Sequence, residues 1–334
     1  MSTPSEPKHD RAAPSLDAVM SERRQLVNLT YRLLGSLVEA EDAVQETYAR
    51  WYGLSMQQQE VIESPGAWLS RVASRICLDL LGSARARREH YTGQWLPEPL
   101  PDPSEWGLRA AAADPADRVT LDESLSIAFL VVLESMTPAE RVAFILHDVF
   151  AYPFTEVAAI TGRTPAACRQ LASSARRRIY AERPPATNTA RQASIVKDFK
   201  RAWETKDIGA LVGLLDPHVI LTGDGGGVVK AALHPYEGGE RVAHFLAHLA
   251  RTAPANGALL ERTVNGQPGL VGHLEGQIVA VYSFEVAGYK ITRMWAMLNP
   301  KKLQLWRMTS LEEPGTGPDP LLPGPWPMTK EGSS

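Results

Sequence analysis

The chain has 334 residues, of which 44% are hydrophobic, and its formal net charge at pH 7 is −3. This length predicts about two or three domains with hydrophobic cores, and the charge excludes a globally basic protein that coats nucleic acid. The 2 cysteines are too few for a disulfide framework or a cysteine-rich metal site, so no metal or other cofactor is expected. No apolar run approaches membrane-spanning length, and the polar N-terminus lacks the apolar part of a signal peptide. We therefore expect a cytoplasmic protein without membrane contact.

Changes in composition along the chain predict folded parts that are joined by linkers. The stretch that begins at Gln94 is dense in proline and acidic residues. Because a residue before proline avoids the helical conformation, we expect an extended linker there rather than a core element. The expected order is a disordered N-terminus at residues 1–17, a helical domain at 18–92, a linker at 93–116, a second helical domain at 117–181, a linker at 182–191, an α+β domain at 192–308 and a disordered tail at 309–334.

The first helical domain contains a mixed acidic and aromatic surface. Apolar positions from Ala43 to Trp51 recur with helical spacing, while acidic and polar residues between them face outward. We expect Tyr48, Arg50 and Trp51 to be exposed beside the acidic face. Such a surface suits a partner helix, and the plainer alternative is a solvated helix face.

A later helix of the same domain has a basic flank. Ser64 and Pro65 form the N-cap and first-turn pair that begins it, and Trp68 lies on its apolar stripe, so we expect Trp68 in the core rather than stacked on a base. The arginines of the flank suit single-stranded DNA, and the plainer alternative is that they serve solubility.

The segment from Phe154 to Arg178 has the pattern of a helix-turn-helix. Gly162 lies where the chain must reverse and a positive φ is expected. Thr155 can cap the first helix, and Thr164 with Pro165 can start the second. The second helix exposes arginines and small polar groups, which contact phosphates and base edges in DNA complexes. We therefore favour DNA binding over an ordinary helical hairpin with a solvated basic face.

The last folded part changes from helices to strands. Strand-like runs follow Asp216, with hairpin-turn signals at Asn265 and Ala287, so an α+β fold with a mostly antiparallel sheet is expected. His244 and His248 are spaced by one helical turn but have no acidic or cysteine partner nearby, so a metal site is not expected.

These segments together resemble one protein family. EAEDAVQETYARWY (Glu39–Tyr52), PGAWLSRVASRICLDLLGSARARREHY (Pro65–Tyr91) and the helix-turn-helix resemble regions two and four of extracytoplasmic-function sigma factors, which are subunits of bacterial RNA polymerase. The motifs WLPEP (Trp95–Pro99), TGDGGG (Thr222–Gly227) and NPKKL (Asn299–Leu303) resemble the subgroup with a SnoaL-like domain at the C-terminus.

The resemblance implies a fold, a function and partners. The fold is two all-α sigma domains followed by a SnoaL- or NTF2-like α+β cone with a curved, mostly antiparallel sheet. The function is to bind core RNA polymerase, recognise the −35 and −10 promoter elements and initiate transcription, with the C-terminal domain as regulator and without enzyme activity. The implied partners are the β′ clamp and β flap of the polymerase and promoter DNA. An unidentified small molecule is a candidate ligand of the SnoaL-like pocket, and the free protein is expected to be a monomer.

The resemblance also assigns residues to roles. Polymerase docking falls to Glu41, Asp42, Gln45, Glu46, Arg50 and Trp51; reading of the −35 element to Thr164, Arg169, Gln170, Ser173, Ser174, Arg176 and Arg177; and contact with the −10 element to Arg71, Arg75, Arg85, Arg87 and Arg88. Regulation between domains falls to Trp95, Leu96, Pro97, Glu98, Pro99, Asp224, Gly225, Gly226, Gly227, Asn299, Pro300, Lys301, Lys302 and Leu303.

The sequence departs from the family pattern at Ser174, where arginine is common, and at Lys301, where aspartate is usual. The first departure puts an upstream DNA contact in question, and the second adds positive charge that could weaken or redirect the contact of the C-terminal motif.

Two other functions remain open from the sequence alone. One is a small-molecule enzyme with a DNA-binding appendage, which would use Asp224 or a pocket histidine as a base. The other is a ligand-sensing repressor that needs no polymerase.

Overall fold

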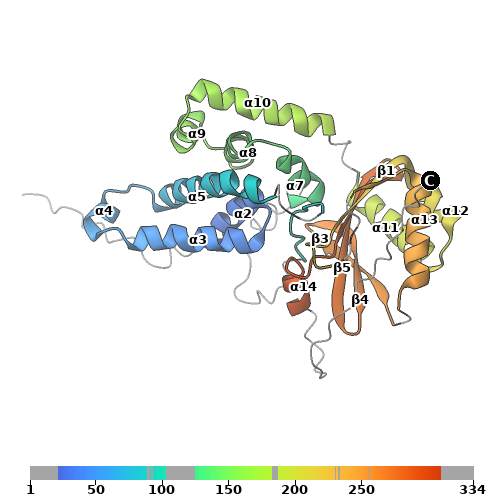
Figure 1. Cartoon of the computed structure of the whole chain (residues 1–334). Coiled ribbons are helices and arrows are strands. Elements are labelled where there is room, and N and C mark those ends of the chain that lie inside the picture. Colours follow the sequence, from blue (N-terminus) through green and yellow to red (C-terminus); the bar gives the residue numbers. More distant parts are fainter. Residues whose placement is uncertain are drawn as a thin grey trace, which may run out of the picture. The chain divides into compact units, whose positions relative to one another are not determined.

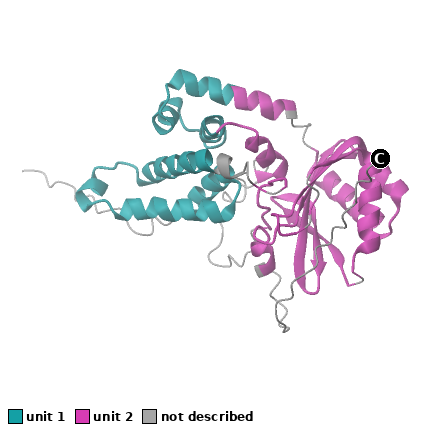
Figure 2. Ribbon diagram, viewed as in Figure 1, with its two compact units in different colours: residues 1–84, 138–173 teal, residues 85–137, 174–334 magenta. Residues whose placement is uncertain are grey.

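The structure is a computed structural model that describes residues 22–88, 91, 93–102, 125–182, 187–229, 231, 234–254 and 256–309 (Figure 1). The segment expected to be a disordered N-terminus, most of the first linker and nearly all of the expected disordered tail lie outside this range. The chain forms two compact units, residues 1–84 with 138–173 and residues 85–137 with 174–334 (Figure 2). Among the described residues, no helix is both long and apolar enough to cross a membrane.

The described residues of the first unit form helices and no strand, and they come from both predicted helical domains. Its core includes Trp51, whose ring meets the ring of Trp68 edge-on at a centroid distance of 5.3 Å. Its elements are α2 (Arg23–Leu34), α3 (Leu37–Tyr52), α4 (Met56–Glu60), α5 (Pro65–Arg88), α8 (Pro138–Phe144), the π-helix η3 (Ile145–Val149), α9 (Phe154–Thr161) and the first part of α10 (Pro165–Glu182).

Local capping signals explain where several of these helices begin and end. The Ser36 side chain accepts a hydrogen bond from the Glu39 amide and so caps α3, and Ser55 forms a capping box with Gln58 at the start of α4. Helix α2 ends at Gly35, whose φ of 70° is left-handed. These residues satisfy backbone groups that a helix end leaves without partners.

The predicted helix-turn-helix is confirmed as α9 and α10. Gly162 has a φ of 66°, and its amide donates to the Ala158 carbonyl, which closes α9. The Thr164 hydroxyl accepts from the Ala167 amide at 3.2 Å and so caps α10. The expectation that Thr155 caps α9 was wrong, because α9 begins at Phe154 behind Pro153.

A strained connection precedes this motif. In η3, the Phe150 amide donates to the Ile145 carbonyl, which is the wider hydrogen bond of a π-turn. Ala151 then adopts a φ of 57°, a left-handed conformation that is unfavourable for a residue with a Cβ.

The second unit contains the α+β fold expected from the sequence. Its strands form one sheet in the order β2-β1-β6-β5-β4-β3, in which β1 and β6 are parallel and the other neighbours are antiparallel. The strands are β1 (Leu215–Asp224), β2 (Tyr236–Glu237), β3 (Ala258–Val264), β4 (Gln267–Leu274), β5 (Gln277–Ala287) and β6 (Lys290–Met297), and the helices are α7 (Ile127–Glu134), α11 (Thr189–Glu204), α12 (Ile208–Leu214), α13 (Gly239–Thr252), α14 (Gln304–Thr309) and the last part of α10.

Helices α11 to α13 lie beside the sheet (Figure 1), and aromatic side chains belong to the buried core of this unit. Trp203 meets Tyr282 edge-on at 5.1 Å, and Phe199 meets Phe284 in the same way at 5.3 Å. The Trp203 indole N–H donates to the Leu246 carbonyl at 2.7 Å, so this buried polar group is satisfied.

Part of the first linker belongs to the core of this unit. Residues 93–102 form neither helix nor strand, and Leu96 and Leu100 are only 4% and 9% exposed. The Trp306 indole N–H donates to the Pro99 carbonyl at 2.8 Å, and Leu100 exchanges hydrogen bonds with Asn265. The expectation that this stretch stays outside any core was therefore wrong, because the C-terminal domain supplies partners that local sequence patterns do not reveal.

The strain at Ala151 predicts the effect of a glycine. Ala151→Gly should raise the free energy of unfolding by about 0.5–1 kcal/mol, because glycine adopts the left-handed region without a Cβ clash but loses more chain entropy on folding. Urea denaturation followed by circular dichroism measures this. Ala159→Gly, at an exposed position in the last turn of α9, is the control and should cost at most about 1 kcal/mol. A loss of stability with Ala151→Gly would contradict the left-handed assignment.

Candidate functional site

The outward face of α3 carries the predicted acidic surface. Asp42, Gln45 and Glu46 are exposed, and Glu41 is half-buried. Glu46 pairs with Arg50 at 3.0 Å across one helical turn, and both side chains are about half exposed, so the pair contributes little to stability. The charges therefore remain available to a partner.

Sequence reasoning assigned the wrong aromatic residue to this surface. Trp51 is only 1% exposed and lies in the core, so the prediction that it faces a partner was wrong. The reason is that Trp51 follows Val44 by two turns on the same apolar stripe. Tyr52 and Val38, which were not predicted, are 52% and 55% exposed on α3 instead, and the Tyr52 ring stacks on that of Tyr48.

The basic flank of α5 is accessible only in part. Arg71 and Arg75 are exposed, whereas the side chains of Arg85, Arg87 and Arg88 lie outside the described part of the structure. The Arg75 guanidinium donates to the carbonyl of Ala159 in the last turn of α9 at 2.7 Å. Carbonyls there lack partners within the helix, and a cation also suits the negative end of the helix dipole. Arg75 thus already has an acceptor within the protein.

A second guanidinium makes a matching contact that sequence reasoning missed. Arg141 on α8 is only 3% exposed, and its Nη1 donates to the carbonyl of Leu33 in the last turn of α2 at 2.9 Å. Burial lowers the pKa of Arg141 to about 9. Nearby, the Arg32 guanidinium lies 5.7 Å from the centre of the Phe150 ring. The apolar surroundings of Arg141 in the sequence gave no sign of this role.

Helix α10 presents most of the residues predicted to read DNA. The boundary between the two compact units falls within this helix, after Ser173. Ala172 and Ala175 are fully buried and mark the inner face of α10. The polar residues between and beside them therefore lie on the outer face of the helix. Thr164, Arg169, Gln170, Ser173 and Arg177 are exposed, and Ser174 and Arg176 are half-buried.

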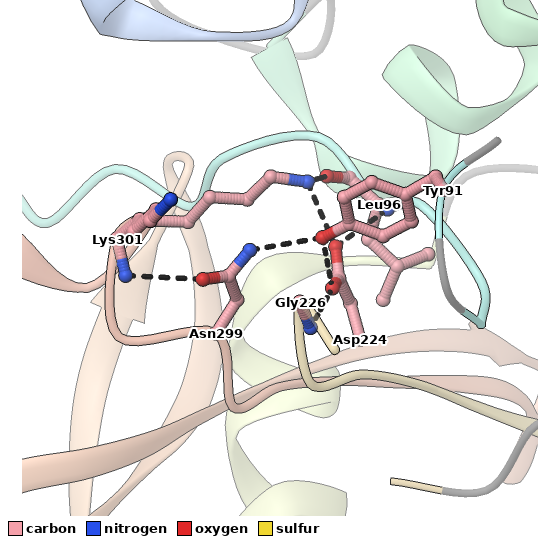
Figure 3. Close-up of polar contacts among 7 residues, drawn as sticks. Tyr91, Leu96, Asp224, Gly226, Asn299 and Lys301 are labelled. Atoms are coloured by element: carbon pink, nitrogen blue, oxygen red, sulfur yellow. Dashed lines mark hydrogen bonds and ion pairs between the residues drawn. The ribbon is translucent and has the colours of Figure 1, made fainter. Parts of the chain in front are cut away.

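The predicted regulatory residues converge on one buried carboxylate (Figure 3). Asp224, at the end of β1, is 0% exposed. Its Oδ1 accepts hydrogen bonds from the Tyr91 hydroxyl at 2.6 Å and the Gly226 amide at 2.9 Å. Its Oδ2 accepts from the Leu96 amide at 3.0 Å and from the Lys302 ammonium at 2.7 Å. We call Tyr91, Leu96, Asp224, Gly226, Asn299 and Lys302 the Asp224 cluster.

Lys302 is the cation of this cluster. Its ammonium also donates to the Leu96 carbonyl at 2.6 Å. It lies 4.1 Å from the centre of the Trp95 ring and 5.3 Å from that of Tyr91, so aromatic faces and a carboxylate together replace its hydration. Burial and the neighbouring carboxylate raise the pKa of Tyr91, which keeps its hydroxyl protonated as a donor.

The turn after β6 determines which lysine enters the cluster. Asn299 donates from its side-chain amide to the Tyr91 hydroxyl at 2.9 Å, while its carbonyl oxygen accepts from the Lys301 amide at 3.0 Å. Lys301 is exposed, and Lys302 makes the contact with Asp224. The expectation that the charge of Lys301 weakens or redirects this contact stays a prediction, and its side chain lies outside the ion pair with Asp224.

Close packing explains the glycines beside Asp224. A Cβ on Gly226, whose φ is 66°, would lie 2.4 Å from the Asn299 side chain, and a Cβ on Gly225 would lie 2.0 Å from the Val229 carbonyl oxygen. Gly227 also has a positive φ, of 71°, and is exposed. The remaining predicted members lie alongside: Trp95 and Pro300 are half-buried, and Pro97, Glu98, Pro99 and Leu303 are buried.

The paired histidines that were considered for a metal site are accessible to solvent. His244 and His248 are exposed on α13. Among the described residues, no group of at least 3 histidine, cysteine, aspartate or glutamate side chains could hold a metal ion. The chemistry of the Asp224 cluster is therefore that of a satisfied ion pair rather than of a free base.

Removal of the Lys302 charge should destabilise the second unit. Lys302→Met leaves the Asp224 carboxylate buried without its cation, which typically costs about 3–5 kcal/mol. Urea denaturation followed by tryptophan fluorescence measures the loss. Lys301→Met, with its exposed side chain, is the matched control and should change stability by less than about 0.5 kcal/mol. Equal effects of the two variants would contradict the assignment of the ion pair to Lys302.

Comparisons with known proteins agree with this arrangement. The Sigma-70 region 2 family model matches residues 18–87, and the Sigma-70, region 4 model matches residues 126–179. The chain is 38% identical to the ECF RNA polymerase sigma factor SigJ of Mycobacterium tuberculosis (strain H37Rv) over an alignment of 293 residues, and the match covers 84% of this chain and 90% of the relative. It is 33% identical to the probable ECF RNA polymerase sigma factor SigI of Mycobacterium tuberculosis (strain CDC 1551) over 299 residues, which are 89% of this chain and 96% of the relative.

A solved structure shows the same fold over nearly the whole chain. The crystal structure of the Mycobacterium tuberculosis extracytoplasmic function sigma factor SigJ is similar with a TM-score of 0.69 and 33% identity, and the match covers 87% of this chain and 99% of that chain. The match therefore includes the helical sigma regions and the α+β domain that contains the Asp224 cluster. The chain belongs to the extracytoplasmic-function family of RNA polymerase sigma factors.

Proposed function

We propose that the exposed surfaces of this sigma factor divide its work among α3, α5 and α10. The acidic face of α3 docks on the β′ clamp of core polymerase, with Tyr52 and Val38 as apolar contacts inside a charged rim. Helix α10 enters the major groove of the −35 element through its exposed arginines and polar residues and lies near the β flap. Arg71 and Arg75 of α5 contact the −10 element, together with Arg85, Arg87 and Arg88.

The C-terminal domain acts as a fused regulator in this proposal. The observation that carries it is the burial of the linker beside Asp224: Leu96 is bonded through both its amide and its carbonyl. This linker leads from the −10-reading helix toward the −35-reading helices. A domain that holds the start of the linker limits how far these two readers can separate, and a signal that opens the Asp224 cluster would remove that limit.

Enzyme activity has less support than regulation. A base at Asp224 would need a free lone pair facing a cavity, but its oxygens accept from Tyr91, Leu96, Gly226 and Lys302. Trp203 and Tyr282 also belong to the buried hydrophobic core of this unit, where their rings are in contact. We therefore propose a cytoplasmic, monomeric and non-catalytic initiation factor, and treat a bound small molecule as a regulator rather than a substrate.

Charge reversal on α3 tests polymerase docking. Asp42→Lys with Glu46→Lys should weaken binding of the full chain to core polymerase at least tenfold, because like charges across an interface cost on the order of several kcal/mol. Fluorescence anisotropy of labelled protein with purified core polymerase measures this, and run-off transcription should fall in parallel. Glu240→Lys with Glu261→Lys, exposed positions in the C-terminal domain, is the control and should bind normally. If both double variants bind alike, α3 is not the docking surface.

Salt dependence tests the arginines of α10. Arg177→Gln should reduce the slope of log K against log [salt] for promoter binding by about 0.9, because one phosphate contact is lost. The measurement uses the holoenzyme and a promoter duplex over a series of salt concentrations. Arg201→Gln removes the same charge from an exposed site on α11 and should leave the slope unchanged. An unchanged slope for Arg177→Gln would remove this residue from the phosphate contacts.

A further inference from the structure

A stack of side chains supports one of the predicted DNA-reading arginines. The rings of His147 and Phe154 are stacked with centroids 3.8 Å apart and planes 27° from parallel. The guanidinium carbon of Arg169 lies 5.7 Å from the centre of the Phe154 ring. His147 and Phe154 are half-buried, whereas Arg169 is exposed. The stack therefore runs from the π-helix η3 through the first residue of α9 to the recognition helix α10.

The backbone around the stack is built to hold His147 in place. The His147 Nδ1 lies 2.9 Å from the Tyr152 carbonyl, and because a carbonyl only accepts, this nitrogen carries the proton. Tyr152 is positioned by the left-handed Ala151 and by its amide, which donates to the Leu146 carbonyl in η3. A π-helix and a strained residue are costly features that persist where neighbouring structure requires them. Here both adjoin the residues that orient the imidazole.

We propose that Phe154, backed by His147, is a positioning residue for promoter recognition: it holds the Arg169 guanidinium in place before DNA is bound. This inference rests on the proposed role of α10 as the −35 reader. The face of an aromatic ring attracts a guanidinium and restricts a long side chain that otherwise samples many rotamers. An arginine restricted in this way loses less entropy when it binds a guanine edge or a phosphate.

The stack is a positioning device rather than a binding site. Phe154 offers no group that reads a base, and its ring contacts both His147 and Arg169. Its effect on DNA must therefore pass through Arg169. The effects of substitutions at Phe154 and Arg169 on DNA binding should therefore be coupled, which a purely structural role of Phe154 would not produce.

The experiment is a double-mutant cycle on the full chain in holoenzyme. Duplexes that the wild-type holoenzyme selects from a randomised pool serve as probes. Phe154→Leu removes the ring but keeps an apolar side chain, and should weaken binding about two- to fivefold, the range expected for an exposed cation–π contact. In an Arg169→Ala background the same substitution should have no further effect. Repeated selection should show that Phe154→Leu relaxes base preference at the positions that Arg169→Ala relaxes.

Further variants separate positioning from folding. His147→Asn keeps a donor for the Tyr152 carbonyl but removes the stacked ring, and should produce a smaller loss in the same direction. Phe245→Leu is the matched control, because Phe245 stacks on Tyr236 at 4.2 Å beside Arg241 in the C-terminal domain. It should leave DNA binding unchanged. Thermal unfolding of each variant shows whether it is folded, and if Phe154→Leu unfolds, His147→Asn decides the question.

The outcomes separate the inference from the function on which it rests. Equal losses from Phe154→Leu with and without Arg169 would overturn the inference and leave the −35 assignment intact. Normal binding by both Phe154→Leu and His147→Asn would overturn it as well. If Arg169→Ala binds the selected duplexes normally, Arg169 is not a reader and the inference falls alone. If the wild-type holoenzyme selects no sequence, the proposed function and the inference fall together.

Discussion

The buried carboxylate of Asp224 imposes the constraint on which the second unit depends. A carboxylate at 0% exposure is costly unless its charge and lone pairs are satisfied. Its donors come from segments far apart in the sequence, around Tyr91, Gly226 and Lys302. Because loss of any donor leaves charge or polarity uncompensated, the segments favour docking or releasing together rather than one at a time. The described part of the linker between the promoter-reading regions is thereby part of the C-terminal fold.

The first unit uses arginine in a comparable way. Arg75 and Arg141 each donate to a carbonyl in the last turn of a helix that belongs to the other sigma region. Arg141 is buried, so its contact is costly to leave unmade, whereas Arg75 is exposed and can exchange partners. A phosphate is a stronger acceptor for a guanidinium than a neutral carbonyl is. In the proposed contact with the −10 element, promoter DNA would therefore compete with Ala159 for Arg75, and the internal contact would subtract from the affinity of this arginine for DNA.

Local signals in the sequence were sufficient for the helix-turn-helix, because Gly162 and Thr164 determine a turn and a cap through their own backbone and side-chain chemistry. The outcome at Trp51 and Leu96 depended on distant partners instead. Helical spacing placed Trp51 on an apolar stripe, but it did not reveal that Trp68 covers its ring. The residues near Leu96 in the sequence did not predict its burial. Its hydrogen-bond partners, Asp224 and Lys302, lie far away in the chain, beyond the second sigma region.

The adjacent lysines of the NPKKL motif have different roles because a turn directs them to different surroundings. Lys302 pairs with Asp224, whereas Lys301 faces solvent. The Asn299 side chain accepts from the Lys301 amide and so bends the backbone, which brings Lys302 to Asp224 while Lys301 stays exposed. An exposed charge is screened by water and salt, so a change of sign at Lys301 alters the interaction energy with Asp224 little. The same change at Lys302 would remove the ammonium that lies 2.7 Å from the Asp224 carboxylate and would add a second negative charge beside a buried site. The departure from the family pattern is therefore at Lys301, an exposed position where a change of charge costs little. Lys302 keeps the cation that the buried carboxylate of Asp224 requires.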